Sequence, residues 1–247
     1  MTGRSAIVVF SRFDSFRLPG KALLDIDGRC LLGRVLDRVH HAAKSWSGSH
    51  CPVIMATSPR PVADRIAAFG EAEGYAVFRG TADDVAARAL DCAHAYALDW
   101  LIRILGDSPF IDPAVIRDIA ALYLSCDAGI VTNVWPRSFP AGSSVDAIAT
   151  SALRRILRET DDIAHREHVT SYGYAKSERF RIVNLSSGNP AWAGRSLAVD
   201  SPVDLERARW IATRLAASGT SRTAPLAQVM ALLDTCPILT AASDDAP

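Results

Sequence analysis

Basic residues gather in one short segment near the N-terminus. Arg12, Arg17 and Lys21 lie within ten residues, directly after the apolar run AIVVF, and Asp14 is the one acid among them. Converging cations and backbone amides can neutralise the charge of a polyphosphate and of a leaving pyrophosphate. The segment therefore predicts either a phosphate-binding loop or a solvated basic turn. It contains neither G-x-x-x-x-G-K-[ST] nor G-x-G-x-x-G, which excludes the Walker and dinucleotide-binding loops here.

Two acids follow apolar runs far apart in the chain. Asp107 comes directly after WLIRIL and Gly106, and Asp200 ends the run SLAVD. A lone aspartate at a strand end is more often a turn former or a helix cap, and Asp112 before Pro113 fits the N-cap. Two carboxylates from separate strand ends can hold one Mg²⁺ against nucleotide phosphates. We expect Asp107 and Asp200 to be metal ligands.

Two other pairs of acidic residues fit structural roles, the first pair better than the second. Asp25 and Asp27 resemble the Asp-x-Asp of nucleotide-sugar glycosyltransferases, but they lie about fifteen residues after the first strand, so we expect a turn. Asp83 and Asp84 precede a helical pattern. Asp84 is equally compatible with a helix cap and with a ligand on the nucleotide side.

The segment His165–His168 contains a His-x-x-His spacing. No third metal ligand of fitting spacing follows it, so a metal site is not expected. Arg166 and His168 fit contacts to an anion or a hydroxyl better, because a bidentate guanidinium suits a carboxylate.

These residues lie in a chain where β-branched runs alternate with helical patterns. The alternation predicts an α/β fold of three-layer Rossmann-like type, with a mainly parallel sheet and helices on both faces. In such sheets ligands bind beyond the carboxyl ends of the strands. We expect strands at 6–10, 52–57, 75–79, 100–105 and 128–134, and helices at 31–44, 61–73, 83–98 and 113–125.

The pattern becomes less regular after residue 135. We expect a strand at VDAIA, two helices around 151–174, strand-like runs FRIVNL and RSLAVD, and a last helix over 220–233. A single domain over 1–235 would then have a nucleotide half at about 1–134, an acceptor and dimer half at about 135–210, and C-terminal helices at 202–234. Residues 236–247 read as a loose tail.

Composition narrows the range of partners. The 27 basic and 27 acidic residues balance, which disfavours nucleic acid and anionic membranes as partners. The five cysteines are odd in number and scattered, as is typical of reduced thiols. No apolar run approaches the length of a signal peptide core or a membrane span, so we expect a cytoplasmic protein.

Several segments in order resemble one family. RLPGK, LLDIDGRCLLGRVLDRV, VFRGTADDVAARAL, ILGDSPFIDP, HREHVTSY and LAVDSPVDLERA are similar to motifs of the cytidylyltransferases that activate acidic sugars, of acylneuraminate and 3-deoxy-manno-octulosonate type. The most similar branch is that of spore coat polysaccharide biosynthesis protein F. The match spans residues 6 to about 210.

The resemblance implies transfer of CMP from CTP to an acidic sugar or related acceptor, with release of pyrophosphate, in surface polysaccharide or glycoconjugate precursor synthesis. It implies a homodimer and Mg²⁺ held by Asp107 and Asp200. Arg12 and Lys21 would be catalytic through positioning and charge stabilisation. Nucleotide contacts would come from Ser11, Arg12, Arg17, Lys21, Arg79, Asp84 and Arg88, and acceptor contacts from Asp146, Arg166, Glu167 and His168.

The sequence departs from the family pattern at three places. Asp14 stands where the family has glycine, and Phe16 replaces a small polar residue. The family's G-x-D-x-E reads GSSVD here, with Ser144 and Asp146 at the acidic positions. These departures keep open a non-catalytic nucleotide-binding relative. A glycosyltransferase of the same fold, dependent on Asp25 or Asp27, is a third hypothesis.

Overall fold

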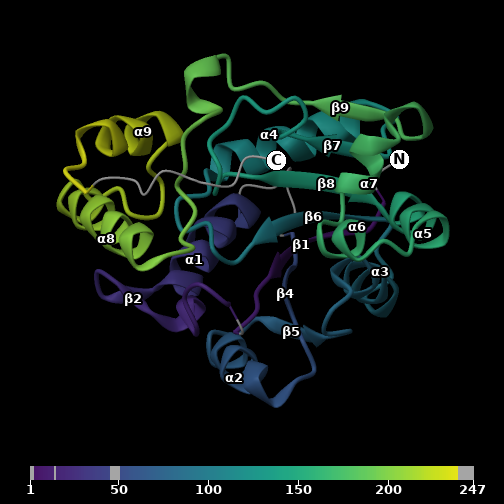
Figure 1. Cartoon of the computed structure of the whole chain (residues 1–247), viewed down its shortest axis with the longest axis horizontal. Helices are drawn as coiled ribbons and strands as arrows, with labels where there is room; N and C mark the ends of the chain where they lie inside the picture. Colours follow the sequence, from purple (N-terminus) through teal and green to yellow (C-terminus); the bar gives the residue numbers. More distant parts are fainter. Residues whose placement is uncertain (1–2, 14, 45–50, 239–247) are drawn as a thin grey trace.

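A seven-stranded sheet forms the centre of the computed structural model (Figure 1), which describes residues 3–13, 15–44 and 51–238. The strand order is β5-β4-β1-β6-β8-β7-β9, and β8 alone runs against its neighbours among these strands. The strands are β1 (Ser5–Phe10), β4 (Val53–Thr57), β5 (Ala76–Arg79), β6 (Trp100–Leu105), β7 (Ile130–Thr132), β8 (Val145–Ala149) and β9 (Ile182–Asn184). The expected mainly parallel α/β sheet is confirmed.

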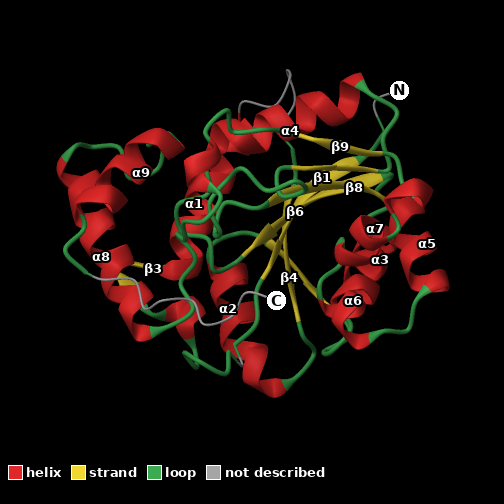
Figure 2. Ribbon diagram, turned by 45° about the horizontal axis from the view of Figure 1, so that its top comes forward, coloured by secondary structure: helices red, strands yellow, loops and turns green. Residues whose placement is uncertain are grey.

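Helices cover both faces of the sheet (Figure 2). Along β1, Ile7 and Val9 belong to one apolar core and Ala6, Val8 and Phe10 to the other, because successive side chains point to opposite faces. The first core contains residues of α1 (Leu31–Lys44), α2 (Asp64–Ala72), α4 (Pro113–Ser125), α8 (Pro202–Ala217) and α9 (Leu226–Thr235). The second contains residues of α3 (Val85–Ala95), α5 (Thr150–Glu159) and α7 (Ser171–Ala175).

The expected elements of the first half agree with the structure to within a few residues at their ends. The prediction of a turn at Asp25 and Asp27 is also confirmed. Strands β2 (Asp25–Ile26) and β3 (Arg29–Cys30) form a hairpin whose turn holds Asp27 at φ 56° and Gly28 at φ 77°. Asp25 accepts a hydrogen bond from Gly28 N within the turn. Asp27 accepts one from the hydroxyl of Thr213, which ties the turn to α8.

The second half differs from expectation in two places. Three helices, α5, α6 (Ile163–Glu167) and α7, replace the expected two. The run RSLAVD is not a strand of the sheet. It is held instead by backbone bonds to residues outside the strands, from Ala141 N to Arg195 O, from Leu197 N to Ala141 O and from Val199 N to Asp107 O.

Within the described residues, no helix is long and apolar enough to span a bilayer. Residues 239–247 of the expected tail lie outside the described part of the chain.

Asp112 links two helices of the first core, as the expected N-cap of α4. Its carboxylate accepts from Ala114 N at 2.8 Å and from Leu226 N, the first residue of α9, at 2.6 Å. Asp112→Ala is expected to lower the free energy of unfolding by about 2–4 kcal/mol, because it removes a cap and leaves a buried donor unpaired. Urea denaturation measures this loss. The matched change Asp162→Ala, at the exposed cap of α6, should cost about 1 kcal/mol or less, and equal losses would contradict the role given to the Leu226 bond.

Candidate active site

A cavity of about 650 Å³ opens at the carboxyl ends of β1 and β6. Its wall combines the loop after β1, the segment after β6, the start of α3, the end of α6 and Asp200. This is where an open α/β sheet is expected to bind its ligand. Its lining includes these sequence-predicted residues: Ser11, Arg12, Arg17, Lys21, Arg88, Asp107, Glu167, His168 and Asp200.

Lys21 lies at the centre of the polar end of this cavity. Its ammonium donates to Asp107 Oδ2 at 3.0 Å, Asp200 Oδ1 at 2.6 Å and the backbone oxygen of Val199 at 2.9 Å. The side chain is buried, and Gly20 before it adopts φ 70°, which only glycine enters at low cost. The Pro19-Gly20 turn thus directs Lys21 inward, between two acids that are 93 residues apart in sequence.

Asp107 and Asp200 face one another across this ammonium. Each keeps one oxygen toward other partners, Ser108 Oγ at 3.3 Å from Asp107 Oδ1 and Arg17 Nη2 at 3.2 Å from Asp200 Oδ2. Both carboxylates remain partly exposed, at 28% and 35% of the side chain. Two acids that both contact one small cation are spaced to contact another cation in the same way.

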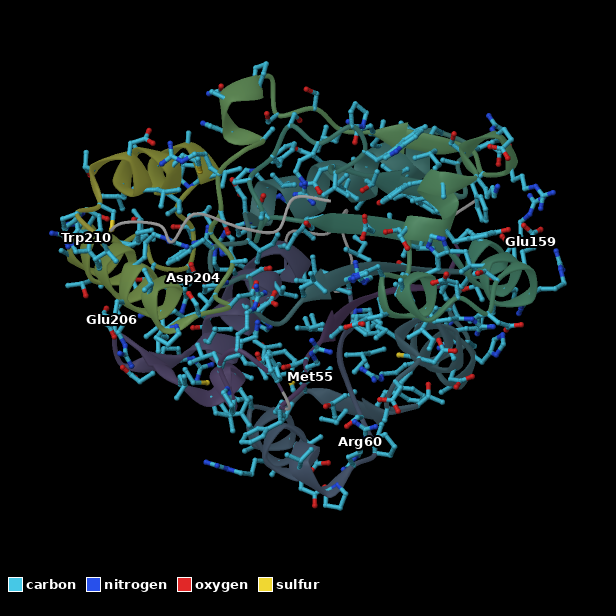
Figure 3. All side chains as sticks on the ribbon, viewed as in Figure 1. Met55, Arg60, Glu159, Asp204, Glu206 and Trp210 are labelled. Carbon is cyan, nitrogen blue, oxygen red and sulfur yellow. The ribbon has the colours of Figure 1, made fainter. Side chains whose placement is uncertain are left out.

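A capping box at the start of α8 fixes the direction of Asp200. Ser201 and Asp204 bond reciprocally, and Asp204 Oδ2 also accepts from Asp200 N at 3.1 Å; Asp204 is labelled in Figure 3. Burial acts to raise the pKa of Asp204, but hydrogen bonds from Ser201 and Asp200 and the charge of Arg207 bring it below its usual value. Asp204 therefore stays ionised and holds the backbone that presents Asp200.

Exposed groups line the opposite side of the cavity. Arg12 Nη1 lies 3.1 Å from Glu167 Oε1, so the loop after β1 and helix α6 are joined by an ion pair at the cavity mouth. His168 follows Glu167 and is exposed. Arg88 of α3 donates to the backbone oxygens of Thr81 and Ala82, with which it closes the loop before its own helix.

Four sequence-predicted residues do not line the cavity. Arg79 bonds to Ser58 O, Arg60 O and Asp64, and Asp146 is buried against Arg103. Asp84 caps α3 through Ala87 N at 2.7 Å and pairs with Arg166 at 2.8 Å. Arg166 also donates to Thr160 O, Leu157 O and Asp161, so four of its five N–H donors bond within the protein. Each is placed by protein contacts that its residue type alone does not reveal.

The cavity also contains residues that sequence reasoning missed. Arg103, Leu105 and Phe10 form its floor, and Val85 belongs to its wall. The sequence signal for these residues is the alternation of side chains between the two faces of β1 and β6, which places Arg103 on the same face as Phe10 and Leu105. Phe16 lines the mouth and is 98% exposed, whereas Asp14 lies outside the described residues.

The donors at Asp107 and Asp200 fit a hard divalent cation. Both are carboxylates, and the cavity lining contains no cysteine or methionine; its one histidine, His168, directly follows α6. Across the described residues, no group of three or more potential ligands forms a complete metal site. Mg²⁺ commonly uses one or two carboxylates and completes its coordination with water and substrate phosphates. The pair therefore suits a metal that arrives together with a nucleotide.

Comparison with known proteins gives a consistent picture. Residues 6–216 match the family model described as cytidylyltransferase. The spore coat polysaccharide biosynthesis protein SpsF of Bacillus subtilis (strain 168) is 26% identical over 203 residues, covering 81% of this chain and 82% of that protein.

Two solved structures share the fold. A cytidylyltransferase from Leptospira borgpetersenii serovar Hardjo-bovis (strain JB197) superposes with a TM-score of 0.87 at 23% identity, covering 99% of this chain and 100% of that one. A CMP:2-keto-3-deoxy-manno-octonic acid synthetase complexed with CTP gives a TM-score of 0.61 at 18% identity, covering 87% and 99%. With its matching family model, sheet topology and acid-lysine cluster at the sheet edge, this chain belongs to the cytidylyltransferase family.

Proposed function

We propose that the protein transfers CMP from CTP to an acidic sugar or a related acceptor and releases pyrophosphate, in surface polysaccharide or glycoconjugate precursor synthesis. The observation that carries the proposal is the cluster of Lys21, Asp107 and Asp200 at the edge of the cavity. Support comes from the family match, from the polysaccharide relative, and from the CTP complex of a structure with this fold.

Asp107 and Asp200 would hold the Mg²⁺ of the reaction. Bound there, the ion would neutralise charge on the phosphates of the nucleotide. Lys21 now lies between the same carboxylates, so its ammonium is positioned to move onto phosphate oxygens when nucleotide and metal enter. Arg17 pairs with Asp200 and is likewise positioned to move from this carboxylate onto a phosphate oxygen.

The displacement itself requires little covalent chemistry from the protein. An acceptor oxygen attacks the α-phosphorus, the bond to the bridging oxygen of the β-phosphate breaks, and pyrophosphate leaves with that oxygen. Lys21, Arg12 and Arg17 would stabilise charge on the phosphates, while His168 and Glu167 on α6 would contact acceptor hydroxyls. Ser11 and Arg88 would contribute nucleotide contacts from β1 and α3.

For the wider organisation we propose one nucleotidyltransferase domain over residues 1–235, working as a homodimer. Two observations favour self-association. Strand β9 is the last in the sheet order, and Trp135 nearby, stacked on Tyr174, is 38% exposed. Light scattering on the purified protein measures the assembly.

A nucleotide screen followed by a turnover assay tests the proposed function. Calorimetric titration of CTP, UTP, ATP and GTP, with and without Mg²⁺, should show Mg²⁺-dependent binding strongest for CTP. Pyrophosphate release should then require an acidic acceptor from a panel that includes 3-deoxy-manno-octulosonate and N-acetylneuraminate. Absence of CTP binding would refute the proposal. Tight binding without turnover on any acceptor would favour a non-catalytic relative, and cleavage of a nucleotide-diphosphate sugar would favour a glycosyltransferase.

The Arg12–Glu167 pair supplies a separate test at the cavity mouth. Both side chains are more than one third exposed, and such pairs are worth about 0.2–1 kcal/mol. Because Glu167 competes with phosphate for Arg12, Glu167→Gln should tighten CTP binding by about 1.5- to 5-fold at low salt. The gain should shrink in 0.5 M salt. Glu178→Gln, exposed and outside the cavity lining, is the control; weaker CTP binding by Glu167→Gln would contradict the competition.

A further inference from the structure

An arginine lies in the middle of the central strand β6. Arg103 pairs with Val8 of β1 and with Asp146 of β8 in the strand register, and its side chain is 10% exposed. It nevertheless lines the cavity, on the same face of the sheet as Leu105 and Phe10. Charged side chains are seldom placed in the interior of a sheet covered on both faces. A ligand that enters the cavity meets this guanidinium at the floor.

Asp146 holds one end of that guanidinium. Arg103 Nη1 donates to Asp146 Oδ2 at 2.9 Å, and Asp146 Oδ1 accepts from Thr132 Oγ1 at 2.6 Å and from the Tyr174 hydroxyl at 3.1 Å. Burial raises the pKa of Tyr174 far above its usual value, so the phenol stays protonated and remains a donor. The carboxylate is thus fully engaged and fixes the orientation of Arg103.

The other edge of the guanidinium has no partner. Nε is buried without a hydrogen bond, and Nη2 makes none to any residue in the described part of the chain. Nε has no accessible surface, so the donors of Arg103 that a carboxylate in the cavity can reach are those of Nη2. Arg166, the arginine expected for this role, uses four of its five N–H donors on protein acceptors.

The location of Arg103 separates it from the phosphate end of the cavity. It precedes Asp107 by four residues in β6 and its neighbouring turn, or about 13 Å of extended chain. Its bond to Asp146 draws the guanidinium toward β8, away from β1 and the basic loop that follows β1. An anion at Arg103 would therefore be a group other than the triphosphate.

We propose that Arg103 is a specificity-determining residue that binds the carboxylate of the acceptor, with Asp146 as its positioning residue. The inference rests on the proposed function and adds to it the group by which an acidic acceptor is chosen over a neutral one. The unpartnered Nη2 would gain charge-assisted hydrogen bonds when that acceptor enters.

Matched acceptors and a conservative variant test this inference. Pyrophosphate release is measured with 3-deoxy-manno-octulosonate and N-acetylneuraminate and with the carboxamide of each. The wild type should prefer the acids by at least about 30-fold in kcat/KM, the order expected for a charged hydrogen-bonded group. Arg103→Lys, which keeps a cation for Asp146 but loses the planar edge, should raise the KM for the acids about 10-fold or more and leave the amides unchanged.

Nucleotide binding separates the two proposals. The Kd of CTP with Mg²⁺, measured calorimetrically, should stay within about twofold in Arg103→Lys and in the control Arg195→Lys, whose exposed pair with Asp234 lies outside the cavity lining. Thermal unfolding checks that each variant is folded. Arg103→Met is a second variant. If Arg103→Met does not fold, the result for Arg103→Lys alone decides the test.

Three outcomes would overturn the role of Arg103. One is an acid preference that survives in folded Arg103→Lys. Another is a CTP Kd that rises while the acceptor KM does not, which would assign Arg103 to the nucleotide. A third is wild-type protein that binds CTP yet neither turns over the acids nor binds them in calorimetric titrations with the non-transferable α,β-methylene-CTP present. Failure of the wild type to bind CTP would instead refute the proposed function.

Discussion

Lys21→Ala is expected to lower kcat for pyrophosphate release by about 100- to 1000-fold, the range found when a preorganised donor to developing charge is removed. In the structure the three donors of this ammonium bond to three acceptors, Asp107 Oδ2, Asp200 Oδ1 and Val199 O. No other lysine lies in the cavity lining. A steady-state assay with saturating CTP and Mg²⁺ measures the effect.

Two further variants make this result specific. Lys176→Ala, at an exposed position outside the cavity lining, should retain wild-type kcat. Lys21→Arg should recover little activity, because the buried position fits a compact ammonium and not a planar fork. If Lys21→Ala kept more than about one tenth of wild-type kcat while folded, Lys21 would be a structural tie between the two acids and not a catalytic cation.

Asp200→Asn and Asp107→Asn are expected to have effects of similar size, with a different signature. Each removes half of the carboxylate pair, so the Mg²⁺ concentration for half-maximal activity should rise by about tenfold or more, and kcat should fall by about 100-fold. Asparagine keeps the size of the side chain and an oxygen for Lys21. A titration of activity against Mg²⁺ at fixed CTP measures both quantities.

The double variant and a distant acid provide the controls. Asp107→Asn combined with Asp200→Asn should cost less than the product of the single effects, because both residues serve one site. Asp25→Asn, in the β2–β3 hairpin, should leave the Mg²⁺ dependence unchanged. A large loss from Asp25→Asn would instead support the glycosyltransferase hypothesis.

Local sequence patterns were sufficient to predict most of the fold. The run AIVVF is apolar at every position because β1 is covered on both faces, so it read as a buried strand. Asp112 and Pro113 identified the start of α4 by cap chemistry. The prediction of a strand at SLAVD was wrong, because Leu197 and Val199 are buried in a segment bonded to Ala141 and Asp107, and composition does not distinguish such a segment from a strand of the sheet.

The candidate site was recovered in part for a related reason. Lys21, Asp107 and Asp200 were singled out because each follows a tight turn or an apolar run, and such positions lie at a sheet edge. The same reasoning did not predict the partners of Arg166 and Arg103. Both are arginines near the cavity, yet Asp84 and Asp161 pair with the first, whereas Asp146 is the one partner of the second among the residues that the structure describes.

The sequence by itself determined the family, the alternating architecture and the acids and lysine of the site, because hydrophobic period, turn residues and ordered motifs are local properties of the chain. Only the tertiary structure decided that Lys21 joins Asp107 to Asp200, that Arg166 uses four of its five N–H donors within the protein, and that Arg103 in the cavity lining keeps Nη2 without a partner among the described residues. The reason is that a side chain's free hydrogen-bonding capacity depends on acceptors brought to it from distant segments. For Lys21 and Asp200 that separation is 179 residues.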